Sequence, residues 1–460
     1  MTDLNSELPV ELELAPLPEG ASASPSLTRN SASRFLADAA GLVFGLLSGV
    51  VTARALGPTG KGLFSSLTLL TGIILWVCSM GLGDAAIVMV GQKKATMQEA
   101  LSVTISAALG LSVVGMVMLW GAALLAFGND WHQVRSAAIL SCLGLPIALL
   151  GYDLGYLLSA QERVSAQSAV VATTSVLTSL GLVLFVGILP LSIAGGVIAN
   201  IAGSGAGIVL AWWLLRRTGL SFRPRFDRAY LVPAARYGIS VAVSYVVTVM
   251  LLRVDVLLTY ALDGSGPAGQ YSVSLALSAL VGLLPIAISA ATFPRLAKVD
   301  ESDAKELTAQ ACRYGAAAAI TVALGLLVTV PIVVPLMFGN AFRPAVVPTL
   351  ILLPGSVFWS IQWILCRAAA ARGWPGLLLR SFLLGLAIMC GMDFVLIPMA
   401  GIKGAAVSAV AGPGAGLLLC LSSYRRSPVW SLRLRALVPR IRDFKSFFSQ
   451  SMQLLPFRRG

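Results

Sequence analysis

Long apolar runs, separated by short polar or Gly/Pro-rich breaks, recur along almost the whole chain. Each run reaches about 20 residues, the length that a helix needs to cross about 30 Å of hydrocarbon. Segments of alternating hydrophobicity, which mark the strands of a membrane β-barrel, are absent. The pattern predicts an all-α integral membrane protein with twelve transmembrane helices, at residues 35–56, 64–90, 100–127, 135–160, 164–188, 192–215, 235–261, 270–294, 308–337, 345–371, 375–397 and 402–424.

The composition supports this interpretation. Of 460 residues, 57% are hydrophobic and only 12% are charged, whereas a soluble domain carries charge on roughly a quarter of its residues. The six cysteines stand singly in apolar segments without metal-ligand spacing, and are interpreted as small buried hydrophobic residues. "GPTGKG" (57–62) lacks the first glycine and the Ser or Thr of a nucleotide-binding loop. We therefore expect no catalytic residue, no metal and no bound cofactor; coupling to H⁺ or Na⁺ stays open.

The distribution of Lys and Arg predicts the orientation. With the N-terminus in the cytoplasm, most of the 33 basic residues fall in cytoplasmic segments, as the positive-inside rule requires. Both termini are then cytoplasmic, and the net charge of +13 marks a face that meets anionic membrane lipids; no nucleic-acid partner is expected. The basic residues on the opposite side are Arg54, Lys61, Arg135, Arg343 and Lys403.

The chain carries a repeat. "LGPTGKGLFSSLTLL" (56–70) is similar to "GSGPAGQYSVSLAL" (264–277), and 189–217 is similar to 397–426 at nearly the same spacing. Each half holds an even number of spans, so both enter the membrane in the same sense, related by a pseudo-two-fold axis along its normal, with a cleft between them. The predicted parts are a disordered cytoplasmic tail at 1–33, six-helix bundles at 34–217 and 235–425, a cytoplasmic linker at 218–234 and a basic amphipathic tail at 426–460.

Two opposite charges stand inside the seventh predicted span, "VMLLRVDVLLTYAL" (249–262). Arg253 and Asp255 are two positions apart on a helix, so their side chains point to nearly opposite sides and each needs another partner. Arg253 is either a structural tie between helices or a lining residue on the path of an anionic substrate. We favour the second, because arginine stays charged and its planar donors suit phosphate.

Asp255 and further polar residues in or beside the spans are also candidates for contact with a substrate. For each, hydrogen bonding between helices or snorkelling towards the membrane surface is an equally good interpretation. Arg54 and Lys61 flank the first outer loop, where they either mark the exit of a span or guide phosphate. The others lie in the second, fourth and tenth spans: Asp84, Tyr152, Asp153, Gln362 and Arg367.

These motifs resemble those of the Wzx-type polysaccharide-biosynthesis flippases, a branch of the multidrug/oligosaccharidyl-lipid/polysaccharide (MOP, MATE-like) exporter superfamily. The resemblance covers roughly 34–425 and rests on "ARALGPTGKGLFSS", "GLGDA", "LRVDVLLTYALDGSGPAGQYSVS" and "PIAISAATFPRLAK". It implies two six-helix bundles that work by alternating access in the bacterial inner membrane. The implied substrate is an undecaprenyl-diphosphate-linked oligosaccharide for surface or exopolysaccharide synthesis, with Arg253 as a cavity cation and a polysaccharide polymerase and co-polymerase as possible partners.

Three alternatives stay open. A cation-coupled multidrug antiporter of the same superfamily would carry an acidic residue within its first or seventh helix; here the first has only Asp38 at its edge, and Asp255 stands beside Arg253. A membrane-embedded polymerase or ligase would present a large outer loop, which the pattern lacks. A lipid II flippase would add two helices after the twelfth span, where only a basic tail follows.

Overall fold

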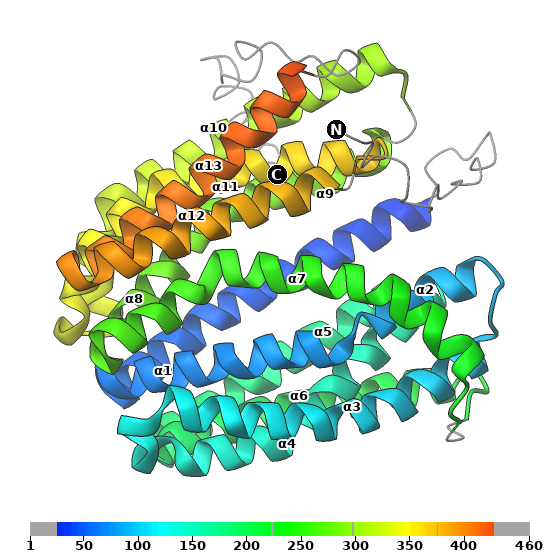
Figure 1. Cartoon of the computed structure of the whole chain (residues 1–460), viewed down its shortest axis with the longest axis horizontal. Helices are drawn as coiled ribbons and strands as arrows, with labels where there is room; N and C mark the ends of the chain where they lie inside the picture. The colour runs from blue at the N-terminus through cyan, green and yellow to red at the C-terminus, as the bar shows by residue number, and fades with distance from the viewer. Residues whose placement is uncertain (1–24, 222–224, 297–298, 375, 427–460) are drawn as a thin grey trace, which may run out of the picture.

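The computed structural model describes residues 25–221, 225–296, 299–374 and 376–426, and all regular structure within these ranges is helical. Short 3-10 or π segments interrupt or extend several of the α-helices (Figure 1). In chain order the elements are α1 (Pro25–Ser79), α2 (Leu82–Gly91), α3 (Met97–Ala126), η1 (Gly128–Asp130), α4 (Trp131–Ala160), α5 (Val164–Leu182), η2 (Val183–Ile188), α6 (Ser192–Arg216), α7 (Arg228–Asp263), α8 (Ser265–Ser278), η3 (Ala279–Gly282), α9 (Leu283–Leu296), α10 (Glu301–Val333), η4 (Val334–Phe338), η5 (Asn340–Ala345), α11 (Val346–Ala371), α12 (Gly376–Ala400) and α13 (Ile402–Arg426).

Eleven helical segments of the described chain are long and apolar enough to cross a membrane. The first of them, Phe44–Gly91, contains a sharp kink at Gly57, whose φ of 66° and ψ of −178° are not helical. Glycine adopts this backbone conformation without steric cost, and Pro58 then begins the next helix with its fixed φ. The chain turns back at the kink, so this segment crosses twice, which confirms twelve crossings (Figure 1).

Two predicted boundaries differ from the structure. α1 begins at Pro25, so the expectation of disorder is wrong for residues 25–33; once a helix has nucleated, each added residue extends it at little cost. α7 begins at Arg228, inside the predicted linker, because the Asp227 side chain caps it by accepting a hydrogen bond from the Ala229 amide at 2.9 Å. Residues 1–24 and the predicted amphipathic helix of the C-terminal tail lie outside the described residues.

The helices form two groups (Figure 1). α3, α4, α5 and α6 pack against one another in the first, and α10, α11, α12 and α13 pack against one another in the second. α1 and α7 lie between the groups: α1 contacts α5 and α8, while α7 contacts α2 and α12. The ribbons of the two groups lie together where α1 kinks and spread apart towards the opposite end. We name these the kink end, where Gly57 and Gly264 lie, and the terminal end, where α6 and α13 end.

The two repeats meet through matching residues where α1 crosses α8. A Cβ atom on Gly62 would lie 1.8 Å from the Ser265 carbonyl oxygen, and one on Gly269 would lie 1.9 Å from the Pro58 carbonyl oxygen. Glycine is therefore required on both sides of the crossing. The pairs Pro58/Ser265 and Gly62/Gly269 share one spacing along the chain, so this contact has the symmetry that the repeat predicts.

A second backbone contact lies nearer the terminal end. α1 and α2 are separated by a break at Met80 and Gly81, where both residues have positive φ. A Cβ atom on Gly81 would lie 2.3 Å from the carbonyl oxygen of Gly238 in α7. The break therefore allows α7, from the second half of the chain, to pack directly on the first group.

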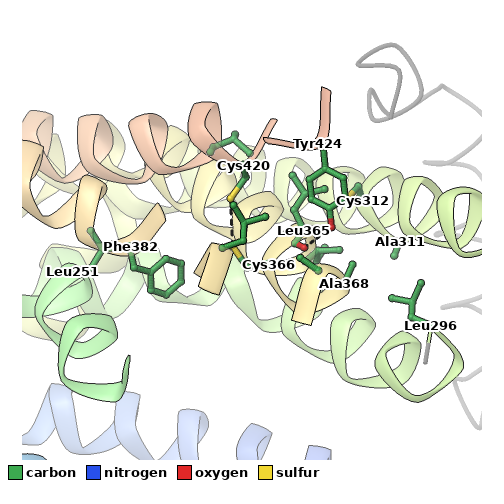
Figure 2. Packing of buried hydrophobic residues seen from close by; sticks show 14 of the residues in the cluster. Leu251, Leu296, Ala311, Cys312, Leu365, Cys366, Ala368, Phe382, Cys420 and Tyr424 are labelled. Atoms are coloured by element: carbon green, nitrogen blue, oxygen red, sulfur yellow. Dashed lines mark hydrogen bonds between the residues drawn. The ribbon is translucent and has the colours of Figure 1, made fainter. Parts of the chain in front are cut away.

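The cysteines are part of the packed interior. All six are free; Cys390 is half-buried and the other five are buried, as the sequence predicts. The largest apolar cluster lies in the second group (Figure 2). There the Cys366 Sγ atom lies 3.3 Å from the Cys420 Sγ atom, and the Tyr424 hydroxyl donates a hydrogen bond to the Leu365 carbonyl oxygen at 2.8 Å. These contacts join α11 to α13.

Candidate substrate cavity

A cavity of about 490 Å³ lies between the two groups of helices. Its walls come from α1 and α5 on one side and from α7, α8 and η3 on the other. Two cations and a set of hydroxyl groups face it, and its described lining holds no carboxylate. We call it the central cavity; its polar lining residues are Ser48, Thr52, Lys61, Ser65, Thr68, Arg253 and Ser272.

Lys61 is one of the two cations. The sequence places it in an outer loop, but the structure places it in the helix that begins after the Gly57 kink, where its side chain faces the central cavity. The loop assignment is therefore wrong, because a kink of one glycine is enough to reverse the chain here. The Lys61 Nζ atom donates a hydrogen bond to the Thr52 Oγ1 atom at 2.8 Å and lies 5.9 Å from the centre of the Phe64 ring.

Arg253, on α7, is the second cation and is exposed to the central cavity. Its guanidinium group forms no hydrogen bond or ion pair with any described residue. Lys61 is near enough to repel it electrostatically. Two like charges that face one water-accessible space, with few partners of their own, create a site for an anion.

Asp255 points away from this site, as helix geometry predicts. It is 1% exposed, and its Oδ2 atom accepts a hydrogen bond from the Tyr271 hydroxyl of α8 at 2.5 Å. Its Oδ1 atom accepts one from the Val256 amide at 2.9 Å. Asp255 therefore holds α7 to α8, and this leaves the Arg253 guanidinium without an ion pair to its near neighbour.

A second cavity of about 240 Å³ adjoins the central cavity in the second group. It lies among α7, α8, η3, α9, α11 and α13, and Arg253 and Ala279 line both cavities. We call it the side chamber; its apolar lining residues include Leu251, Leu252, Leu275, Leu283, Ile286 and Leu352.

A third cavity, of about 210 Å³, lies in the first group, among α1, α4 and α6. Thr68 and Gly72 line both this cavity and the central cavity, so the two are neighbours. We call it the polar chamber; its polar lining residues are Thr68, Thr71, Ser141, Asn200 and Ser204. The side chamber and the polar chamber thus adjoin the central cavity in different groups of helices.

Arg54 lies outside these cavities and joins α1 to η4 at the kink end. Its Nε and Nη2 atoms donate hydrogen bonds to the carbonyl oxygens of Met337 and Leu336, at 2.7 Å and 2.6 Å. Both carbonyl groups belong to the last turn of a helix, where carbonyl oxygens have no intrahelical N–H partner. A second link at this end runs from the Tyr260 hydroxyl to the Asp130 Oδ2 atom at 3.1 Å.

Asp84, Tyr152 and Asp153 lie together near the terminal end, apart from the three cavities above. Asp153 is fully buried, and neither of its carboxylate oxygens has a hydrogen-bond partner among the described residues. Asp84 is close enough to interact with it electrostatically. The Tyr152 ring packs edge-on against the Trp76 ring, with 4.9 Å between centroids. The structure brings these three candidates together, but not with Arg253.

Gln362 and Arg367 contact other helices. Gln362 is fully buried, and its Nε2 atom lies 2.2 Å from the position that a Cβ atom on Gly416 of α13 would occupy. The Arg367 guanidinium lies 4.4 Å from the centre of the Phe293 ring and 6.0 Å from that of Trp363, in cation–π geometry. These two candidates do not face the central cavity.

The sequence analysis missed the hydroxyl groups of the cavities. Ser48 and Thr52 stand one helical turn apart on α1, and each hydroxyl donates to a carbonyl oxygen one turn earlier in the helix. Such bonds lower the free-energy cost of a hydroxyl group at any position in a membrane helix, so the presence of Ser or Thr alone does not indicate a cavity. Their spacing on one face was the available signal.

Comparison with solved structures finds a similar fold in transporters and a flippase. The lipid II flippase MurJ in an inward closed conformation superposes with a TM-score of 0.71 at 13% identity, over 94% of each chain. An inward-facing multidrug resistance MATE family transporter gives 0.67 at 15% identity, over 84% of this chain and 94% of the other. The MATE multidrug transporter DinF-BH gives 0.65 at 15% identity, over 89% and 97%. At these identities the likeness concerns the fold.

The fold and its apolar helices define a multi-pass membrane protein. The sequence model of the polysaccharide biosynthesis protein family matches residues 27–300, more than half of the chain, and the chain belongs to that family. No curated protein sequence matches it significantly. The match spans the kink at Gly57, both cavity cations and the crossing of the two repeats, so the site lies within the family region.

Proposed function

We propose that this protein is a flippase, which moves an undecaprenyl-diphosphate-linked oligosaccharide across the bacterial inner membrane by alternating access, for surface or exopolysaccharide synthesis. The observation that carries the proposal is the pair Lys61 and Arg253, two cations facing one cavity whose described lining has no carboxylate. The negative charge of a diphosphate would balance these two cations. The surrounding hydroxyl groups could form hydrogen bonds with the sugars. The family match and the MurJ-like fold support this proposal.

The proposed orientation places both termini in the cytoplasm and the kink end at the outer face. The distribution of basic residues supports it, since few of them lie near the kink end. In this orientation the structure corresponds to a state closed to the outside, through Arg54 and the Gly62–Gly269 crossing. Substrate would enter from the cytoplasmic side. A polymerase at the outer face would receive the product.

Deletion of the gene tests the proposal. Lipid-linked repeat units should accumulate in the inner leaflet while surface polysaccharide is lost, and the wild-type gene on a plasmid should restore both. Unchanged polysaccharide in a strain without a redundant exporter would contradict the assignment. The measurement is the amount of lipid-linked oligosaccharide in membrane extracts, beside the polysaccharide at the cell surface.

A cation-coupled multidrug antiporter is the second candidate. It is favoured by the MATE transporters among the similar folds and by the buried carboxyl groups of Asp153 and Asp393. Organic cations would meet two positive charges in the central cavity, which disfavours this candidate. Resistance to toxic organic cations on expression, with surface polysaccharide unchanged on deletion, would support the antiporter over the flippase.

A further inference from the structure

Aliphatic side chains form a large part of the lining of the side chamber. Among its lining residues, the Ser278 and Ser356 hydroxyls donate to carbonyl oxygens of their own helices, those of Leu275 and Leu352. Asp255 is held by Tyr271. With these polar groups engaged, the surface that the chamber offers is formed mainly by leucine, isoleucine and alanine side chains.

Arg253 stands at the boundary of this chamber. It lines both the side chamber and the central cavity, so an anion held by its guanidinium would have an apolar space on one side and a hydroxyl-lined space on the other. The polar chamber extends the hydroxyl-lined side into the first group through Thr68. From the central cavity to the side chamber, the lining therefore changes from hydroxyl groups and cations to mainly aliphatic side chains.

A polyprenyl-diphosphate glycan has the same order of groups: sugars, then diphosphate, then isoprene units. We infer that the side chamber binds the isoprene units next to the diphosphate, while Arg253 and Lys61 bind the diphosphate and the sugars occupy the central cavity and the polar chamber. This inference rests on the proposed flippase function and adds a site for the lipid part of its substrate.

The chamber is accessible to such a chain. Leu252 and Ile286 line it and are 37% and 36% exposed, so the chamber is not sealed within the bundle. The rest of a long polyprenyl tail can therefore continue outward while its first units stay inside.

Binding of two soluble probes tests this site in the full chain reconstituted in nanodiscs. Farnesyl diphosphate carries three isoprene units, whereas inorganic diphosphate carries none. The wild type should bind farnesyl diphosphate more tightly by at least about tenfold, which corresponds to about 1.4 kcal/mol. Calorimetric titration gives both dissociation constants, with empty nanodiscs as the blank for partitioning into lipid. Equal affinities for the two probes would overturn the inference.

Two variants fill the chamber, and a third provides a matched control. Ile286→Trp and Leu252→Trp should remove the preference for farnesyl diphosphate and leave the affinity for inorganic diphosphate within about twofold, because Arg253 is intact. The control, Ile332→Trp, is the same isoleucine-to-tryptophan substitution on the exposed face of α10, away from the chamber. This variant should still bind farnesyl diphosphate more tightly than inorganic diphosphate. If one chamber variant binds neither probe, its fold is disrupted. The other chamber variant then tests whether the chamber binds isoprene units.

The outcomes separate this inference from the function on which it rests. A farnesyl preference that persists in both folded chamber variants contradicts the isoprene site. Inorganic diphosphate binding that is undiminished in Arg253→Gln contradicts the anion site, and with it the proposed function. A loss of diphosphate binding in Arg253→Gln, together with a loss of only the preference in Ile286→Trp, supports both.

Discussion

The Tyr271 hydroxyl donates a hydrogen bond of 2.5 Å to the Asp255 carboxylate, across the interface of α7 and α8. Both side chains are buried, and the bond engages the only acidic residue near Arg253 on the same helix. A buried carboxylate needs such donors, because an unsatisfied one carries its full desolvation penalty. This relationship is what keeps Arg253 available to an anion.

Removal of the Tyr271 hydroxyl should therefore destabilise the protein. Tyr271→Phe leaves the Asp255 oxygen without its donor, and we expect a loss of about 1–3 kcal/mol, seen as a lower midpoint of thermal unfolding in detergent. Tyr314→Phe, a half-buried tyrosine elsewhere, serves as the control. An unchanged midpoint in Tyr271→Phe would show that the hydrogen bond does not stabilise the α7–α8 interface.

Arg253 should contribute to transport and little to stability. Since its guanidinium has no hydrogen bond or ion pair with a described residue, Arg253→Ala should unfold at the wild-type temperature. Its export of lipid-linked glycan should fall by at least about tenfold, as one charge-assisted contact contributes about 1.5–3 kcal/mol. Arg253→Lys should retain intermediate activity, because it keeps the charge but not the planar fork.

Surface polysaccharide and thermal stability, measured for each variant at equal protein levels, check this prediction. Lys403→Ala removes an exposed cation that does not line the central cavity, and should export normally. Full export by Arg253→Ala would contradict a role in substrate binding. A lower unfolding temperature with normal export would favour the structural tie that the sequence left open.

Arg54 should hold the kink end closed. Arg54→Ala removes two hydrogen bonds between α1 and η4, which follows α10, so the distribution of distances between the two groups at this end should lengthen or broaden. Spin labels at Arg135 in α4 and Arg343 in η5, both exposed, report that distance by double electron–electron resonance. Arg380→Ala, at another exposed position, should leave the distribution unchanged. An identical distribution in Arg54→Ala would rule out a closing role.

The crossing of the repeats should tolerate no side chain. Gly62→Ala places a Cβ atom 1.8 Å from the Ser265 carbonyl oxygen, so the helices must separate; overpacking of this kind costs about 1–3 kcal/mol or more. Gly121→Ala is the matched control, since no atom lies within 4 Å of its added Cβ. Yield of folded protein by size-exclusion chromatography distinguishes them. Equal yields would mean that α1 and α8 separate freely.

The sequence was sufficient to predict the crossings, the repeat and the exposed Arg253, because each depends on a local signal: apolar length, motif spacing, or a charge that hydrocarbon disfavours. It was insufficient for Lys61, whose position depends on how sharply the chain turns at Gly57. A polar stretch of "GPTGKG" has the composition of a loop, yet most of it is helical. The backbone conformation of Gly57 determines whether this stretch is a loop or the start of a helix, and composition does not predict that conformation.

The partners of the remaining candidates depend on tertiary packing. Arg54, Gln362 and Arg367 each contact residues far away in the chain, so no local pattern separates them from cavity residues. The side chamber had no signal at all, because leucine and alanine face lipid, protein and cavity alike in such a chain. Only the arrangement of helices shows that these apolar residues surround a space beside Arg253.

The backbone contact of Gly62 with Gly269 also has a consequence for how the two halves can diverge. Each glycine is confined by main-chain atoms of the other copy, so neither copy can acquire a side chain there while its counterpart stays as it is. The matching segments of the two halves therefore limit each other's substitutions at this crossing.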